Sequence, residues 1–94
     1  MARDGDAHFV VVRVGDEKLG FDLASVSEII RVQNLAYMPL APKSLLGLAN
    51  MRGTVLPVIS LRSLLHFPDA PLDDAARIIV INRGSPVGFV VDRV

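Results

Sequence analysis

The residues that could do chemistry in this chain are few and widely spaced. The two histidines, His8 and His66, lie far apart, and neither belongs to a metal-binding spacing such as His-x-x-x-His. The adjacent acids Asp73 and Asp74 fall in a proline-containing loop, where carboxylates are normally solvated. The chain has no cysteine, which excludes a thiolate zinc site and a cysteine nucleophile. Glycine-rich phosphate loops and the Gly-x-Ser-x-Gly motif are also missing from the sequence. We therefore predict a protein without catalysis, cofactor or bound metal.

The charged residues do not indicate a nucleic-acid or membrane ligand, because ten basic and ten acidic side chains cancel. The chain also has four Phe, one Tyr and no Trp, too few for a base-stacking surface. No acidic residue lies between Glu28 and Asp69, an interval that holds four basic side chains: Arg31, Lys43, Arg52 and Arg62. This asymmetry predicts either a local basic surface for an acidic protein partner or four solvated cations. Arg52, next to Gly53, is either a partner contact or a strand-end arginine paired with an acid.

Length and composition limit the architecture to one domain of 94 residues, half of them hydrophobic. No stretch approaches the roughly 20 apolar residues of a membrane-spanning helix, so we expect no direct membrane insertion. The first residues show no signal-peptide pattern, and with no cysteine present the cytoplasm is the expected compartment.

The pattern along the chain predicts an all-β fold with short helical turns. Six or seven strands are expected, and small barrels are favoured over an open sheet because barrels remove reactive edges. Strands are predicted at residues 9–14, 19–23, 48–53, 54–59, 77–82 and 87–91, with a charged loop at 15–18 and a surface loop at 68–74. Phe9, Phe21 and Phe89 are assigned to the core.

Three helical turns are predicted between the strands. Ser25 and Glu28 have the spacing of a capping box, although the β-branched residues after them favour an early return to strand. A single helical turn is predicted over residues 43–46, ending at Gly47. Ser60 is predicted to cap a short helix over 61–65 that has its leucines on one face. Pro57 donates no hydrogen bond, so its strand should lie at an edge or carry a bulge.

Residues 50–62, N-M-R-G-T-V-L-P-V-I-S-L-R, resemble the signature N-L-R-G-x-x-x-P-x-x-D-L-R of CheW-like domains, the scaffold family of bacterial chemotaxis. Residues 15–22, 26–29, 38–48 and 87–94 resemble further family segments in the same order, including V-x-E-I and V-G-x-x-V-D-x-V. Ser60 stands where the family usually has Asp, and both residues can cap a helix.

The resemblance implies two small SH3-like barrels and a non-enzymatic adaptor that joins the histidine kinase CheA, through its regulatory domain, to the cytoplasmic tips of chemoreceptors. The alternative is a regulatory CheW-like module of a larger kinase or of a receiver-fused adaptor. A small hydrolase that uses Asp22, Asp92 or a histidine is the hypothesis from another class. Carried over position by position, the family's partner-binding residues are matched by Val26, Glu28, Gly47, Asn50, Arg52 and Gly53. Both glycines could equally serve turn geometry alone.

The expected organisation is a flexible lead over residues 1–8 and a CheW-like domain over 9–94. A complete family domain continues past the V-D-x-V strand, so the resemblance implies a C-terminally truncated domain whose second barrel is incomplete. We expect Phe89, Val90 and Val91 to present apolar faces and an unpaired edge there, and the chain to form a homo-oligomer through edge strands.

Overall fold

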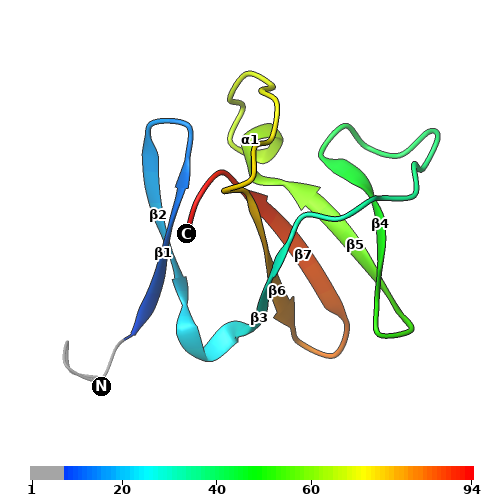
Figure 1. The fold of residues 1–94 in the computed structure, drawn as a ribbon, viewed down its shortest axis with the longest axis horizontal. Helices are drawn as coiled ribbons and strands as arrows, with labels where there is room; N and C mark the ends of the chain where they lie inside the picture. Colours follow the sequence, from blue (N-terminus) through cyan, green and yellow to red (C-terminus); the bar gives the residue numbers. More distant parts are fainter. Residues whose placement is uncertain (1–7) are drawn as a thin grey trace.

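The computed structural model describes residues 8–94, so most of the expected lead, residues 1–7, lies outside it. Within these residues, seven strands, one short α-helix and one 3-10 turn follow one another along the chain (Figure 1). In order they are β1 (Phe9–Val14), β2 (Glu17–Asp22), the 3-10 turn (Leu23–Ser25), β3 (Val26–Arg31), β4 (Leu45–Met51), β5 (Thr54–Ser60), α1 (Leu61–Leu64), β6 (Arg77–Asn82) and β7 (Pro86–Val91). The all-β prediction is confirmed. No helix in the described part is long and apolar enough to cross a membrane.

Five strands form one sheet in the order β3-β6-β7-β5-β4, in which only the β5–β7 pair is parallel. The two edge strands are brought together, because Ala36, in the chain after β3, exchanges backbone hydrogen bonds of 2.8 and 2.9 Å with Leu48 of β4. This bridge closes the sheet into a small barrel. Its core contains six buried residues: Ala49, Leu56, Val58, Ile78, Val80 and Val90.

The β1–β2 hairpin stands beside this barrel as a separate two-stranded sheet and packs on the outer face of β6 and β7 (Figure 1). Side chains alternate along a strand, so Ile78 and Val80 enter the first core while Ile79 enters the second. The buried members of the second core are Val12, Val14, Leu61, Ile79 and Val91. Within the described residues, the hairpin covers this core from one side without closing a second barrel.

Several local predictions were right. Ser60 accepts a 3.2 Å hydrogen bond from the Ser63 backbone and caps α1, and residues 68–74 form an exposed loop. The strand predictions at 77–82 and 87–91 correspond to β6 and β7. The hairpin is also present, but its turn is shorter than predicted, because Glu17 and Lys18 already pair with β1 and only Gly15 and Asp16 remain as the connection.

Two predicted helical turns were wrong, because strand pairing overrides the local signal. The turn after β2 occupies Leu23–Ser25 and is capped by Asp22, whose carboxylate accepts from the Ala24 N–H at 3.0 Å. The capping box at Ser25 is therefore absent, and β3 begins at Val26. Residues 43–46 do not form a helical turn either, since β4 begins at Leu45 and pairs with β5.

The expected burial was wrong at several positions. Phe9 is exposed, whereas Val90 and Val91 are buried because β7 is an inner strand between β6 and β5. Of the three leucines expected on one face of the short helix, only Leu61 is buried, while Leu64 and Leu65 are exposed.

The strand that contains Pro57 does not lie at an edge of the sheet, because β5 is an inner strand between β7 and β4. Pro57 is tolerated there because pairing with β7 begins only at the next residue, Val58.

Candidate partner-binding site

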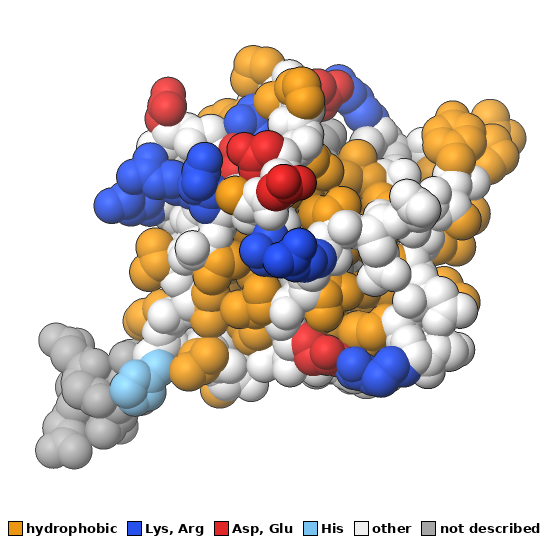
Figure 2. Space-filling model, in the orientation of Figure 1, with side chains coloured by type: hydrophobic (Ala, Val, Ile, Leu, Met, Phe, Trp, Pro, Cys, Tyr) orange, Lys and Arg blue, Asp and Glu red, His pale blue; other side chains and the backbone are white. Residues whose placement is uncertain are grey.

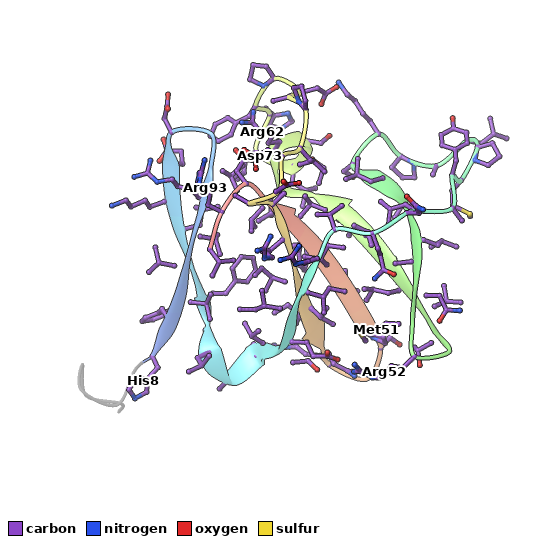
Figure 3. The ribbon with its side chains drawn as sticks, in the orientation of Figure 1. His8, Met51, Arg52, Arg62, Asp73 and Arg93 are labelled. Carbon is purple, nitrogen blue, oxygen red and sulfur yellow. The ribbon has the colours of Figure 1, made fainter. Side chains whose placement is uncertain are left out.

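The β4–β5 turn holds Arg52 in a defined position. It contains two residues, Arg52 and Gly53, with φ angles of +52° and +83°. Two consecutive positive φ angles are typical of the tight hairpin turn in which Asn and Gly are usual. Asn50 reinforces the turn, since its Oδ1 accepts a 2.8 Å hydrogen bond from the Gly53 N–H. The segment Asn-Met-Arg-Gly therefore has a local explanation: Asn50 braces the turn, Gly53 permits it, and Arg52 occupies its tip (Figure 3).

Arg52 reaches across the barrel to Glu28 on β3. Its Nη1 donates to Oε1 at 3.1 Å, and its Nη2 donates to Oε2, so the pair is bidentate. β3 and β4 are opposite edges of the five-stranded sheet, and this ion pair joins them at the end of the barrel that carries the β4–β5 turn. Hydrogen bonding to Arg52 lowers the pKa of Glu28, and the same contact raises the pKa of Arg52. Both groups therefore stay charged at neutral pH.

The pair is accessible from outside. The Arg52 side chain is 71% exposed and that of Glu28 is 27% exposed. A guanidinium in this state offers free N–H donors to a second carboxylate, and the Glu28 carboxylate keeps unused lone pairs. The arrangement can therefore recognise charged groups on another protein.

The structure brings together only part of the predicted set. Glu28, Asn50, Arg52 and Gly53 lie at one end of the barrel, but Val26 does not join them. A β-bulge between Val26 and Glu28 breaks the alternation of β3, and Val26 packs against the second core. The bulge is what allows Val26 to face the hairpin while Ile30 faces the barrel core.

Gly47 is buried at the other end of β4, also at a bulge. A Cβ atom at this position would lie 2.6 Å from the Ala36 carbonyl oxygen and 3.0 Å from the Leu35 Cβ. Glycine is therefore required where the β3 extension crosses β4 to close the barrel. Because Gly47 is itself buried, an effect of this residue on partner binding would act through the shape of the barrel.

The predicted basic surface is largely neutralised within the chain. Arg52 pairs with Glu28, and Arg62 pairs with Asp92. Lys43 approaches Asp69 at 3.9 Å, with both side chains highly exposed. Arg52 is therefore a paired arginine in this structure, as one of the two hypotheses predicts. Its guanidinium is still accessible to a second protein.

Sequence reasoning missed the Arg62–Asp92 contact. Arg62 Nε and Nη2 donate to the Asp92 carboxylate at 3.2 and 2.8 Å, and Arg62 Nη1 donates to the Pro68 carbonyl at 2.8 Å. Asp92 also accepts from the Gly15 N–H at 2.8 Å. This cluster ties α1, the β1–β2 turn and the end of β7 together, near the Arg62 and Arg93 labels of Figure 3. Arg62 is the last residue of the signature, and Asp92 is the Asp of V-G-x-x-V-D-x-V. Nothing in the sequence indicates that these two residues, 30 positions apart, form an ion pair.

Electrostatics at Asp92 do not favour acid–base catalysis. Burial alone raises the pKa of Asp92, but hydrogen bonds from Arg62 and Gly15 outweigh it, and the net pKa lies below its ordinary value. A general acid needs the opposite shift. Asp22 is occupied as a helical cap, and both His8 and His66 are exposed. Within residues 8–94 no three His, Asp or Glu side chains cluster as metal ligands would.

The described chain is a small β-barrel with an added hairpin, and it carries an exposed guanidinium–carboxylate pair at one end. The CheW-like domain profile matches residues 8–94, and this chain belongs to that family. It is 37% identical over 93 residues to the probable chemotaxis protein CheW of Rhizobium etli, covering 96% of this chain and 59% of that protein. It is 29% identical over 96 residues to the chemotaxis protein CheW of Treponema pallidum, covering 97% of this chain and 56% of that protein.

The fold is also similar to a crystal structure, that of the scaffolding protein TtCheW from Thermoanaerobacter tengcongensis. The TM-score is 0.85 at 28% identity, over 90% of this chain and 59% of the other. The SH3-like architecture predicted from the resemblance is confirmed. The chain spans little more than half the length of the relatives it matches.

Proposed function

We propose that this chain is a non-enzymatic adaptor of bacterial chemotaxis signalling, which couples chemoreceptors to the histidine kinase CheA. The observation that carries the proposal is the exposed Glu28–Arg52 pair, formed by the Glu of V-x-E-I and the Arg of N-x-R-G. Membership of the CheW-like family and the chemotaxis names of the relatives support it. The contacts within the site serve recognition, and no cofactor, metal or catalytic group is assigned.

The site residues divide into two kinds under this proposal. Glu28 and Arg52 contact the partner, and Asn50 and Gly53 hold the turn that presents Arg52. Val26 and Gly47 act through the bulges that shape β3 and β4, so their effect on binding is indirect. The partners we assign are the CheA regulatory domain and the cytoplasmic tip of a chemoreceptor, which places the protein in the cytoplasm. No contact with nucleic acid or membrane lipid is proposed.

The alternative is that the chain is a regulatory CheW-like module of a larger kinase or of a receiver-fused adaptor. The chain covers 56–59% of the two relatives named above, and this partial coverage is compatible with the alternative. Both versions use the same site, and both assign residues 9–94 to one CheW-like domain whose second barrel is incomplete.

Self-association is proposed at a surface other than the predicted one. The outer face of the hairpin carries Phe9 and Val11, 61% and 57% exposed, and Val94 nearby is 57% exposed. A neutral chain has little repulsion to oppose contact between two such faces. We therefore assign the homo-oligomer contact to β1 and β2.

The adaptor proposal is tested by measuring binding of the 94-residue chain to two purified probes. These are a CheA regulatory domain and a receptor-tip helical hairpin, both from the same bacterium, titrated by calorimetry. Binding of either probe that is lost in Arg52→Glu supports the proposal. Absence of binding to both probes by a folded chain overturns it.

A further inference from the structure

The β1–β2 hairpin carries a row of three basic side chains that the proposed site does not use. Arg13 of β1 lies directly opposite Lys18 of β2, and on its other side it forms a β-bridge with Arg93. Residues directly opposite on neighbouring strands share one face of a sheet, so the three side chains stand in a row near the β1–β2 turn. Figure 2 shows Lys and Arg side chains gathered at the upper left, over the end of the hairpin that carries this turn in Figure 1.

The basic row lies on the outer face of the hairpin. Val12 and Val14, on either side of Arg13, are buried in the second core, so the alternation of side chains along β1 turns Arg13 outward. Arg13 is exposed, and so are the two other basic residues of the row. An open hollow of about 170 Å³ lies among the three cations, and Val11, which is 57% exposed, adds apolar surface to it. The row is therefore accessible to a second molecule.

This arrangement is unfavourable in the chain on its own, because like charges directly opposite on neighbouring strands repel each other. Within residues 8–94, Arg13 and Lys18 form no ion pair with a side-chain or terminal carboxylate. Arg93 has only Asp73, at 3.9 Å, and these two side chains are 62% and 68% exposed. An exposed contact of this length contributes little, so the charge of the row is largely uncompensated.

The acidic residues next to the row in the sequence are directed elsewhere. Glu17 lies opposite Val14 and therefore belongs to the other face of the hairpin. Asp92 is held by Arg62 and by the Gly15 N–H. The uncompensated cations are thus not those of the acid-free interval that the sequence analysis singled out, where Arg52 and Arg62 are paired.

We propose that Arg13, Lys18 and Arg93 form a binding surface for an acidic segment of a partner protein. Charge complementarity selects this occupant, because carboxylates remove the repulsion within the row and can accept paired hydrogen bonds from a guanidinium. A membrane surface fits less well. Each cation near a lipid surface contributes only about 1 kcal/mol, and lipid-binding clusters typically hold about four to eight cations.

The basic row is separate from the Glu28–Arg52 pair. Figure 3 places Arg93 beside the hairpin in the upper half of the molecule and Arg52 at the lower end of the barrel. A partner on the basic row therefore leaves the ion pair accessible. The inference goes beyond the adaptor proposal and does not depend on it, since it rests on other residues and on another face.

The test measures binding of a short fluorescent peptide that alternates glutamate with alanine, by anisotropy, with the 94-residue chain as titrant. A peptide with glutamine in place of glutamate is the uncharged probe. The row variant combines Arg13→Gln with Lys18→Gln. The matched control combines Arg31→Gln with Arg83→Gln, because both arginines are exposed and the net charge changes by the same amount.

We expect the unchanged chain and the control to bind the glutamate peptide, and the row variant to bind it about tenfold or more weakly. Added salt should weaken the binding, because the row is solvent-exposed. The melting temperature of the row variant should be equal to that of the unchanged chain or higher, because the substitutions relieve repulsion between neighbouring strands. Sedimentation velocity alongside shows that neither variant changes the oligomeric state.

Several outcomes overturn the inference. They are equal peptide binding by the row variant and the control, no binding of the glutamate peptide by the unchanged chain, and equal affinity for the glutamine peptide. Binding of the unchanged chain, but not of the row variant, to vesicles of phosphatidylserine and phosphatidylcholine, without peptide binding, would reassign the row to a membrane. A melting temperature that falls together with the binding would make the row structural. The adaptor proposal is unaffected by each of these results, because its probes are the CheA regulatory domain and the receptor hairpin.

Discussion

The Arg52 guanidinium forms a bidentate ion pair with the Glu28 carboxylate and so joins the β4–β5 turn to the strand at the opposite edge of the sheet. The backbone of Arg52 is in the left-handed region, which costs a non-glycine residue free energy. The pair and the Asn50 brace hold it there. A side chain positioned this firmly and still 71% exposed is suited to recognition.

Arg52→Glu should weaken binding of the chain to its partner by at least tenfold, with the melting temperature within a few degrees of the unchanged chain. The new carboxylate faces Glu28 and repels both it and an acidic partner group, but the site is solvated, so the fold tolerates the change. Calorimetry against the CheA regulatory domain and the receptor hairpin, with thermal denaturation alongside, measures both effects. Unchanged binding of both probes would contradict the prediction.

The charge-swapped variant Glu28→Arg with Arg52→Glu separates two roles of the pair. It restores an internal ion pair with reversed polarity. We expect binding to remain weak, because the partner meets a carboxylate where it needs a guanidinium. Full recovery of binding would show that the pair acts only by bracing the barrel.

Much of the fold was predictable because its signals are local. β1, β6 and β7 are β-branched runs, Ser60 is a cap three residues before its donor, and Gly53 follows the residue at the tip of the β4–β5 turn. The misassigned segments, 25–28 and 43–46, are those whose conformation depends on pairing with distant strands. Local propensity is weak against such pairing.

Four of the six predicted site residues, Glu28, Asn50, Arg52 and Gly53, lie together in the structure, but their geometry was not predictable from the sequence. Glu28 and Arg52 were both singled out, yet their contact spans 24 residues and depends on barrel closure at Ala36 and Leu48. The bulge that turns Val26 away from Glu28 leaves no mark in the residue types, because Val-Ser-Glu also fits a regular strand. The exposure of Leu40 could not be predicted either, because the sequence shows only an apolar residue between two prolines and does not show its φ angle.

Asp92→Asn should make the protein less stable at neutral pH, by about 1–2 kcal/mol, because Arg62 and the Gly15 N–H lose a charged acceptor. The folded-state pKa of Asp92 lies below the ordinary value of 3.8, so its contribution is present above that pH and disappears as the pH falls through the folded value. The unchanged chain should therefore lose stability in this acidic window, and Asp92→Asn should lose less.

Chemical denaturation at neutral pH and at about pH 3 measures this difference. Asp69→Asn serves as the control, because it removes one carboxylate from an exposed loop where the nearest cation is 3.9 Å away. Equal acid sensitivity of Asp92→Asn and the unchanged chain would mean that other carboxylates, Glu28 among them, dominate the acid response.

Gly47→Ala should destabilise the fold by about 1–3 kcal/mol, because the added methyl group would lie 2.6 Å from the Ala36 carbonyl oxygen. Gly20→Ala is the control: a Cβ there would meet Phe9 at an ordinary 3.5 Å, so its stability should be unchanged or slightly higher. Denaturant midpoints of the two variants decide the matter. A Gly47→Ala variant of full stability that no longer binds would instead place Gly47 in direct contact with a partner.

Val11→Lys should shift the chain from oligomer to monomer in sedimentation velocity at tens of micromolar. Val11 lies on the outer face of the hairpin opposite Gly20, and with Phe9 it supplies the apolar surface that two copies would share. A lysine there adds charge to both copies and disfavours association. Val55→Lys is the matched control, since Val55 is 58% exposed on β5 and belongs to the other sheet. The Val55→Lys variant should sediment as the unsubstituted chain does.

If the unsubstituted chain sediments as a monomer at these concentrations, with a cooperative melt, the hairpin face does not mediate association. The two-stranded sheet would then be stable without a cover, because its inner face already packs against Ile79 and Val91.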